Sequence, residues 1–252
     1  MDVTQRFTDR VENYIKYRPG YPPECLAFLR EAAGLQPWWT VADVGSGTGI
    51  LTRLFLENGN RVFAVEPNEA MREAGRSLLA GFDRYHSVCG TAEETGLKAR
   101  TVNLVAAGQA FHWFDAARAR EEFLRVLVPG GQVALLWNER KHDATPFLAA
   151  YDELLQREGT DYESIRHENV DGERLSAFYG PGGYREAAFP NQQTFDWDGL
   201  FGRAMSCSYV PGPGHPRHEA FTAALRELFE GHAEDGRVAF EYDTRIYCGP
   251  LS

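Results

Sequence analysis

A glycine-rich run is the first part of this chain whose residue types and spacing can do specific chemistry. DVGSGTG (residues 43–49) follows a short apolar stretch at residues 41–44. Glycines at a strand-to-helix turn let backbone N–H groups approach a ligand where a Cβ would obstruct it. Asp43 would then lie at the carboxyl end of a strand, where open α/β sheets bind ligands. The run predicts a cofactor site that includes Asp43, Gly45 and Gly47.

A second acidic residue narrows the kind of cofactor. Glu66 ends the next apolar stretch, 21 residues after Gly45, where a carboxylate can accept hydrogen bonds from two ribose hydroxyls. NAD-dependent dehydrogenases share this acid, but their glycine pattern is GxGxxG, which leaves the helix N-terminus open to a pyrophosphate. Here the pattern is GxGxG, and Asp43 would repel that anion. A cofactor with an ammonium and a sulfonium group fits better. The competing interpretation is that the glycines only turn the chain.

Aromatic and basic side chains elsewhere are candidates for the acceptor side of a reaction. His112 follows a predicted strand at residues 102–108 and is our candidate general base, although it can equally be a hydrogen-bonded wall residue. Trp113 is either a pocket wall or part of the core. Tyr17 and Arg18 precede Pro19, and Arg18 is suited to pairing with a carboxylate of cofactor or substrate; the alternative is an ordinary surface arginine. Tyr209, late in the chain, is a candidate acceptor contact.

No metal site is expected. His215, His218 and Cys207 lie close in sequence, but no second ligand pair completes a tetrahedral set. The acidic pairs at residues 93–94 and 121–122 have the pattern of solvated helix or loop faces.

Alternating strands and helices must hold the candidate residues in place. Apolar stretches at residues 41–44, 61–66, 87–90, 102–108 and 132–137 alternate with helical patterns over about a hundred residues. This order predicts βαβ units and a parallel, doubly wound sheet. The continuously apolar strands agree, because both faces of such a sheet are covered. Asn68 and Asp115 are expected helix N-caps, and Gly34 is expected to end the helix after Pro22-Pro23.

After Trp137 the alternation stops, and we expect a cap over the open edge of the sheet. We predict a single domain over residues 1–252, divided as follows: an N-terminal helical lid at 1–35, a cofactor-binding core at 36–139, a cap at 140–236 with an antiparallel strand near 184–196, and a final antiparallel strand at 237–250. Within the cap, residues 140–180 are polar, and we expect one helix near residues 146–157 followed by loop.

Composition excludes several classes of protein. The chain has 252 residues and a net charge of −10, which repels phosphate backbones and anionic membranes. No run approaches the roughly 18 apolar residues of a membrane span, and the N-terminus lacks the apolar region of a secretory signal. The four cysteines show no CxxC spacing and are expected to be reduced. We therefore expect a cytoplasmic protein, monomer or homodimer, with no nucleic-acid or membrane partner.

The chain also resembles a known family. DVGSGTG, VFAVEPNEAM, GTAEETGL, AAGQAFHWFD and EEFLRVLVPGGQVALLWNER are similar to class I S-adenosylmethionine (SAM)-dependent methyltransferases of the type-11 group. YIKYRPGYP and SCSYVPGPGHPRH resemble the branch that includes trans-aconitate methyltransferase-like proteins. The resemblance implies a Rossmann-like, seven-stranded, mostly parallel sheet in the order 3-2-1-4-5-7-6, with the last strand antiparallel.

The resemblance also assigns residues. It implies that Gly45 and Gly47 contact the methionine part of SAM and that Glu66 binds the ribose. The residues implied around the adenine and the sulfonium are Pro67, Met71, Thr91, Ala92, Gln109 and Ala110. The family often has an acid where Thr91 stands here, so the adenine contact would differ. We therefore expect a SAM-dependent methyltransferase of small molecules, with an acid or a hydroxylated metabolite as acceptor; the alternative is a non-catalytic SAM-binding regulator.

Overall fold

A seven-stranded sheet organises the molecule. The computed structural model describes residues 11–160, 162 and 172–252. The strands are β1 (Thr40–Val44), β2 (Arg61–Val65), β3 (Tyr85–Val88), β4 (Val102–Gly108), β5 (Leu127–Arg140), β6 (Arg185–Phe195) and β7 (Val238–Gly249). Their order is β3-β2-β1-β4-β5-β7-β6. This is the predicted order, and the protein has the predicted Rossmann-like α/β fold.

Strands β1 to β5 are parallel, and β7 reverses the direction. β7 pairs antiparallel with β5 on one side and with β6 on the other. The carboxyl ends of β1, β2 and β4 therefore meet at one edge of the sheet, together with the loops that follow them. This edge brings the turn after β1, the end of β2 and the loop after β4 together.

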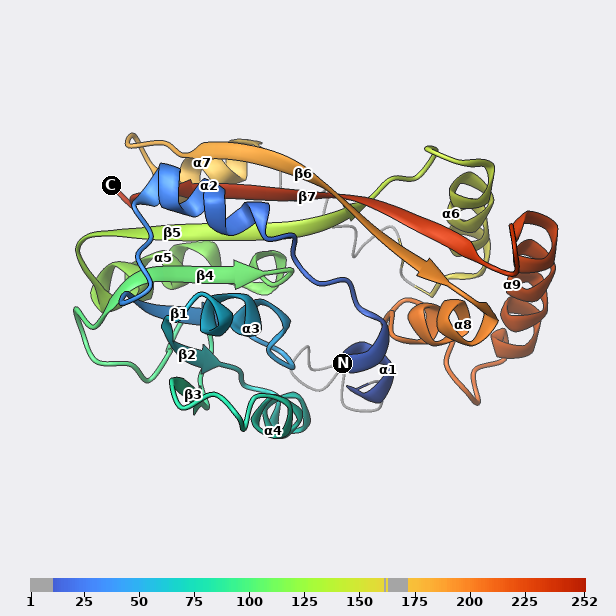
Figure 1. Cartoon of the computed structure of the whole chain (residues 1–252), viewed down its shortest axis with the longest axis horizontal. Helices are drawn as coiled ribbons and strands as arrows, with labels where there is room; N and C mark the ends of the chain where they lie inside the picture. The colour runs from blue at the N-terminus through green and yellow to red at the C-terminus, as the bar shows by residue number, and fades with distance from the viewer. Residues whose placement is uncertain (1–10, 161, 163–171) are drawn as a thin grey trace.

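Helices cover both faces of the sheet. They are α1 (Val11–Tyr17), α2 (Glu24–Ala33), α3 (Ile50–Glu57), α4 (Glu69–Leu78), the short 3₁₀ helix η3 (Phe111–Trp113), α5 (Ala116–Val126), α6 (Pro146–Glu158), α7 (Gly172–Tyr179), α8 (Trp197–Met205) and α9 (His218–His232). In Figure 1, α2 and α3 lie in front of the sheet and α5 lies behind it. Each side has its own buried apolar cluster, one around Leu29 and Phe55 and the other around Phe123 and Phe178.

Local sequence explains where the core helices begin and end. The Asn68 side chain accepts the Met71 N–H at the start of α4, and Asp115 accepts two N–H groups at the start of α5. Gly34 ends α2 in the left-handed conformation, with φ of +76°, which glycine adopts without steric cost. These three predicted helix ends are confirmed.

The turn after α5 differs from its prediction. We expected a strand that begins only at residue 132 and ends at residue 137. Instead β5 begins at Leu127 and continues to Arg140, with a break in its register against β4 between Val102 and Leu104. Val102 pairs with Leu127 and Leu104 with Gln132, so four residues of β5 lie opposite one residue of β4 across the Pro-Gly-Gly sequence.

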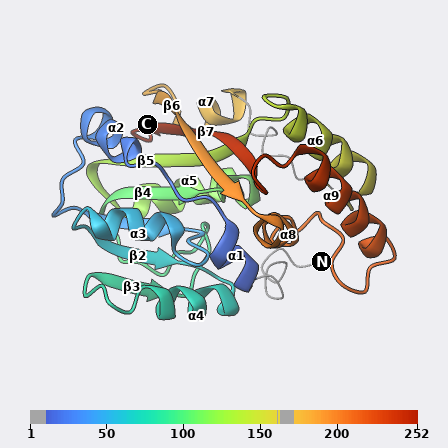
Figure 2. The same ribbon diagram turned by 45° about the vertical axis from the view of Figure 1, so that its right-hand side comes forward.

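A second, smaller core lies beyond the parallel part of the sheet. The far ends of β5, β6 and β7 extend past the other strands, and α6, α8 and α9 pack there (Figures 1 and 2). Their buried side chains form a separate apolar cluster that includes Tyr151, Leu200, Leu225 and Phe240. We call this region the cap.

The predicted boundaries of the cap need two changes. The strand expected near residues 184–196 exists as β6, but it is the edge strand of the main sheet rather than a cap element. Residues 172–179 form helix α7, which packs behind the sheet, although the polar stretch at 140–180 suggested loop. Leu175, Phe178 and Tyr179 are the buried side chains of α7. Three apolar residues within polar sequence do not give a clear helical period, so the sequence did not predict this helix.

The predicted N-terminal lid also divides into two parts. Residues 1–10 lie outside the described residues. Helix α1 packs against α8 of the cap and near α4, whereas α2 packs on β6 and β7 and belongs to the main core. In the part of the chain described here, no helix is long and apolar enough to cross a membrane.

Candidate active site

The glycine-rich turn connects β1 to α3 in a tight, left-handed path. Gly45, Gly47 and Gly49 all have positive φ, of +68°, +56° and +88°. The N–H groups of Gly45 and Ser46 both donate to the Val65 carbonyl, at 2.9 and 3.1 Å, which ties the turn to β2. A Cβ on Gly45 would lie 2.7 Å from the Cβ of Ala110. Glycine is therefore required here both by backbone conformation and by close packing.

Glu66 lies at the end of β2 and faces the same turn. Its Oε2 accepts the N–H of Gly47 at 2.9 Å, and its Oε1 accepts the N–H of Asn68 at 2.8 Å. The pKa of Glu66 is raised from its ordinary value, because the effect of burial outweighs these two backbone hydrogen bonds, which lower it. Each carboxylate oxygen can accept one more hydrogen bond. The carboxylate is thus held in place with capacity left for a ligand hydroxyl.

A cavity of about 190 Å³ lies beside this turn, and we call it the glycine cavity. Nine of the predicted cofactor-binding residues line it: Gly45, Gly47, Glu66, Pro67, Met71, Thr91, Ala92, Gln109 and Ala110. The Thr91 hydroxyl accepts the Glu94 N–H, so it also stabilises the local turn. Residues predicted from four separate motifs therefore surround one space.

Asp43 does not line the glycine cavity. It is fully buried at the end of β1, where its Oδ2 accepts the Thr52 hydroxyl at 2.6 Å and its Oδ1 has no hydrogen-bond partner. Burial raises the pKa of Asp43 to about 7, an effect that the Thr52 hydroxyl opposes. A buried carboxylate oxygen without a partner is costly, so this atom is placed to receive a donor or a cation.

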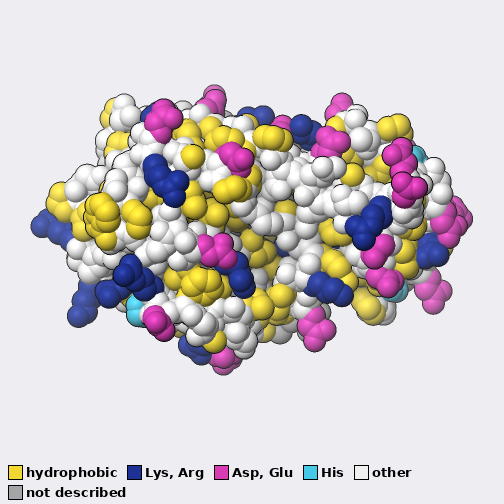
Figure 3. Space-filling view, in the orientation of Figure 1, with side chains coloured by type: hydrophobic (Ala, Val, Ile, Leu, Met, Phe, Trp, Pro, Cys, Tyr) yellow, Lys and Arg dark blue, Asp and Glu magenta, His cyan; other side chains and the backbone are white. Residues whose placement is uncertain are grey.

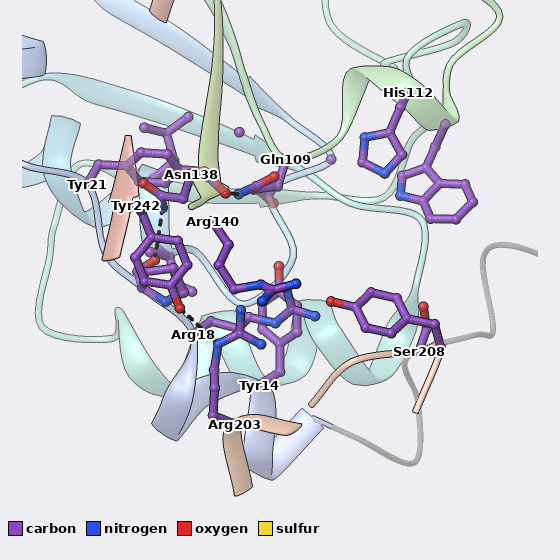
Figure 4. A pocket seen from close by; sticks show the side chains of 18 of the residues that line it. Tyr14, Arg18, Tyr21, Gln109, His112, Asn138, Arg140, Arg203, Ser208 and Tyr242 are labelled. Atoms are coloured by element: carbon purple, nitrogen blue, oxygen red, sulfur yellow. Dashed lines mark hydrogen bonds between the residues drawn. The ribbon is translucent and has the colours of Figure 1, made fainter. Parts of the chain in front are cut away.

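A second cavity of about 140 Å³ adjoins the first, and we call it the arginine cavity because Arg18, Arg140 and Arg203 line it. The two cavities share a wall formed by Tyr14, Gly45, Gly108, Gln109 and Trp113. Figure 4 shows Arg18, Arg140 and Arg203 converging on one space, with His112 on the far side. Asp43 lines this second cavity, close to the shared wall.

The loop after β4 forms much of the shared wall. Gln109 has φ of +56°, and its side chain donates to the Asn138 carbonyl at 3.1 Å. Helix η3 follows at once and carries His112 and Trp113, whose rings lie 4.7 Å apart. His112 and Trp113 both line the arginine cavity, and so does Tyr209 from the cap. These three predicted residues are brought to one site.

Arg18 and Tyr17 behave differently from each other. Arg18 lines the arginine cavity rather than the glycine cavity; its guanidinium stacks 5.0 Å from the Tyr14 ring and donates to the Ser206 carbonyl at 3.1 Å. Tyr17 lines neither cavity. A Cβ on Gly202 would overlap the Tyr17 ring, which shows how closely α1 packs on α8. Tyr14 and Tyr17 are three residues apart on α1, so their side chains leave the helix in different directions, and only Tyr14 of the two reaches the cavities.

Several lining residues were not predicted. Asn138 and Arg140 directly follow the apolar stretch at residues 132–137, so the rule that selected Asp43 would also have selected them. Arg203 and Tyr242 carry no comparable signal, because a single arginine in α8 and a tyrosine in an alternating strand are ordinary features of those elements. Their position depends on the packing of the cap.

Two acidic side chains also differ from the predicted solvated faces. Glu93 lines the glycine cavity and accepts the Asp115 N–H at 2.9 Å. Glu122 is buried and accepts hydrogen bonds from Thr95 and Arg125. Both carboxylates stabilise the loop after β3 against α5. Among the described residues, no group of three His, Cys, Asp or Glu side chains is placed to hold a metal ion.

Comparison with known proteins agrees with this geometry. Residues 42–135 match the family model described as a methyltransferase domain. An uncharacterized methyltransferase of Mycobacterium tuberculosis is 38% identical over 158 residues, which are 63% of this chain and 62% of that protein. The chain thus matches less than two thirds of the length of this relative.

Solved structures share the fold. A candidate type II methyltransferase from Anaeromyxobacter dehalogenans superposes with a TM-score of 0.67 and 24% identity, over 93% of this chain and 98% of that one. A phosphoethanolamine N-methyltransferase of Haemonchus contortus, solved with S-adenosylhomocysteine, gives a TM-score of 0.57 and 16% identity, over 99% and 58%. The family match and these similarities support a methyltransferase domain at residues 42–135, on a fold shared with solved methyltransferases.

Proposed function

We propose that this chain is a SAM-dependent methyltransferase that acts on a small-molecule acceptor. The observation that carries the proposal is the pair of adjoining cavities with a shared wall at Gln109 and Trp113. A methyl transfer needs two reactants that meet at one point, in line, and positioning supplies much of the rate enhancement. Two adjoining cavities that are lined in part by the same residues satisfy this requirement.

The residues present fit SAM. The glycine cavity has an acid with acceptor capacity, Glu66, for the ribose hydroxyls, and an apolar rim of Pro67, Met71 and Ala92 for the adenine. The unpartnered Oδ1 of Asp43 suits the ammonium group of the methionine part. Arg18 has an unpartnered, buried Nε and suits the carboxylate of that part. The opposite charges at the two ends of the methionine part are thus matched.

When bound, SAM supplies a methyl group that passes to a lone pair of the acceptor, while the carbon–sulfur bond breaks and its electron pair stays on sulfur. The shared wall holds the acceptor in line and excludes water. A hydroxyl acceptor must lose a proton, and we propose His112 as the base. His142 is a second candidate, because its Nδ1 lies 2.7 Å from Asp152, which fixes its ring beside the same cavity.

The alternative function is a non-catalytic SAM-binding regulator, in which the acceptor site is closed. A cavity of about 140 Å³ beside the shared wall favours the enzyme.

We also propose a cytoplasmic monomer or homodimer without nucleic-acid or membrane partners. On the face in Figure 3, basic side chains are interspersed with acidic ones and form no single patch, which supports the proposal. The trans-aconitate methyltransferase-like branch remains our proposed place in the family.

Two measurements test the proposed function. Thermal shift with SAM, S-adenosylhomocysteine and NAD should show stabilisation by the first two compounds only. Incubation of the protein with methyl-labelled SAM and a pool of small metabolites should then transfer label to a metabolite. Stabilisation by SAM without any labelled product would favour the regulator, and stabilisation by NAD alone would overturn the cofactor assignment.

A further inference from the structure

Three arginine side chains from separate parts of the chain meet at the arginine cavity. Arg18 follows α1, Arg140 ends β5 and Arg203 lies in the last turn of α8 (Figure 4). Arg140 and Arg203 are only 8% and 6% exposed. The whole chain has a net charge of −10, so three cations around one small space are not a consequence of composition. Each buried charge needs a compensating partner.

Arg140 has a partner for its charge but not for all its donors. Its Nη2 lies 2.6 Å from Asp152 and 2.7 Å from the Tyr162 hydroxyl, and its guanidinium stacks 4.9 Å from the Tyr151 ring. Its Nη1 is buried and has no hydrogen-bond partner. An unmade hydrogen bond from a buried guanidinium is expensive. Arg140 therefore keeps one donor for a ligand.

Arg203 and Arg18 have no carboxylate partner among the described residues. Arg203 donates to the Tyr242 hydroxyl at 3.3 Å and to the Cys207 sulfur at 2.9 Å. Arg18 donates to a backbone carbonyl and has a buried Nε without a partner. Apart from the Cys207 sulfur, the contacts of both guanidiniums are uncharged groups. Among the described residues, the three guanidiniums thus outnumber the carboxylates beside the cavity, which are Asp43 and the Asp152 that pairs with Arg140.

The Cys207 thiol reports this excess. It is completely buried, and burial alone would raise its pKa. Arg203 and then Arg18 oppose burial and lower the pKa of Cys207 to about 6. By contrast, burial raises the pKa of Cys25 and of Cys248 to about 12, although Arg185 opposes the effect at Cys248. The guanidiniums therefore stabilise the Cys207 thiolate by more than burial destabilises it.

We infer that Arg140 and Arg203 bind an anionic group of the acceptor, a carboxylate or a phosphate, and so select small anions as substrates. This inference rests on the proposed function and decides between its two acceptor classes. Arg18 is excluded from the anchor because its proposed role is to hold the cofactor carboxylate. A planar guanidinium presents paired donors that match both oxyanions.

The anchored anion is not the group that is methylated. Neighbouring cations stabilise the negative charge of an oxyanion, and they lower its basicity for the same reason that they lower a pKa. A good nucleophile must instead lie at the shared wall, near Gln109 and Trp113, away from the guanidiniums. The acceptor therefore carries at least two polar groups, one anchored by Arg140 and Arg203 and another that receives the methyl group.

Binding of simple anions tests the inference. Succinate and inorganic phosphate are titrated into protein saturated with S-adenosylhomocysteine, with neutral succinamide as the matched uncharged probe. We expect the anions to bind and the diamide to bind at least about tenfold more weakly, because charge-assisted hydrogen bonds are lost. Stronger binding of succinate than of phosphate assigns a carboxylate, and the reverse order assigns a phosphate. Equal binding of succinate and succinamide overturns the inference.

Variants show where the anion binds. Arg203→Met should weaken anion binding about tenfold or more while changing S-adenosylhomocysteine binding by less than about threefold. Arg203→Lys keeps the charge, serves if the methionine variant does not fold, and should give an intermediate loss. The matched control is Arg226→Met. The Arg226 side chain is exposed on α9 of the cap, where it pairs with Glu230. Unchanged anion affinity in both Arg203 variants contradicts the inference.

Cys207 gives a readout that is independent of turnover. A bound anion cancels part of the positive potential, so it should raise the pKa of Cys207, measured by thiolate absorbance in a Cys89→Ser background. A pKa that does not move with saturating anion overturns the inference. Failure of the proposed function looks different: S-adenosylhomocysteine would not bind and label would not transfer, while anion binding and the change at Cys207 could still be measured in the protein alone.

Discussion

The two cavities are built in different ways. Apart from Tyr14 of α1, the glycine cavity is lined by short segments that follow β1, β2, β3 and β4. The arginine cavity draws Arg18, Arg140, Arg203 and Tyr242 from places up to 224 residues apart in the sequence. The first kind of site needs only that parallel strands end at one edge. The second also needs α1, the ends of β5 and β7, and α8 to pack correctly.

This contrast assigns separate tasks to the two cavities. Cofactor affinity should depend on the residues next to the sheet, and acceptor choice should depend on the cap. Residues at the shared wall or on α1 should affect both. Substitutions at four residues test this division, in order of decreasing effect on cofactor binding.

Glu66→Ala should have the largest effect on cofactor binding. The variant removes the acceptor of the proposed ribose hydrogen bonds and leaves the N–H groups of Gly47 and Asn68 without their acceptor. Loss of charge-assisted hydrogen bonds costs about 1.5–3 kcal/mol, which is roughly tenfold to a hundredfold in SAM affinity. Calorimetry with Glu73→Ala, an exposed acid on α4, provides the control. Wild-type affinity in Glu66→Ala would remove this residue from the cofactor site.

The charge of Asp43 should make SAM binding depend on pH. Its pKa in the folded protein is raised to about 7 by burial, from an ordinary value of 3.8. Binding the ammonium group requires the carboxylate, so SAM affinity should fall about tenfold from pH 8 to pH 6. Asp43→Asn should weaken binding and remove most of this dependence. The same steep dependence in Asp43→Asn would assign the titration to another group.

The same shift predicts how stability changes without ligand. Between pH 4 and 7 the folded protein holds a proton on Asp43 that the unfolded chain has already lost. The stability contributed by this group is therefore present at low pH and lost as the pH rises through about 7. Asp43→Asn should flatten this part of the stability profile, measured by denaturant unfolding.

Arg18 should have a smaller effect, because it is partly exposed and lines the arginine cavity rather than the glycine cavity. Arg18→Ala should weaken SAM binding by about fivefold. Arg18→Lys should weaken it less, because lysine keeps the positive charge but lacks the planar pair of donors. Lys16→Ala, at an exposed position on the preceding helix α1, is the control. Hydrogen exchange at residues 11–20 should also slow when SAM binds. Wild-type affinity in Arg18→Ala together with unchanged exchange would show that this segment only packs against the cap. Residues 1–10 of the expected lid lie outside the described residues.

Tyr209→Ala should have the smallest effect on the cofactor. Tyr209 lines only the arginine cavity and packs its ring 5.0 Å from that of Tyr162. We expect turnover to fall while SAM affinity stays within about threefold, because no cofactor contact is removed. Tyr209→Phe separates the hydroxyl from the ring. Loss of SAM binding with unchanged transfer per bound SAM would show that the cap belongs to the cofactor site.

The sequence determined the core of the fold and the glycine cavity. Helix caps at Asn68 and Asp115, the left-handed glycines of the turn and the apolar strands are local features, and local features appear in the sequence as short patterns. The similarity of those patterns to a family gave the strand order. Nine predicted cofactor residues line one cavity because each lies in a segment that begins where a parallel strand ends.

Only the tertiary structure decided the arginine cavity. Arg140 could have been selected from its place after an apolar strand, but Arg203 and Tyr242 could not. Their approach depends on the antiparallel register of β7, which places Tyr242 opposite Arg140, and on the packing of α8 beside it. Tyr17 was misplaced for a similar reason, since its ring fills space above Gly202. Side chains brought together by long-range packing leave no spacing in the sequence, because their distance is set by the core between them.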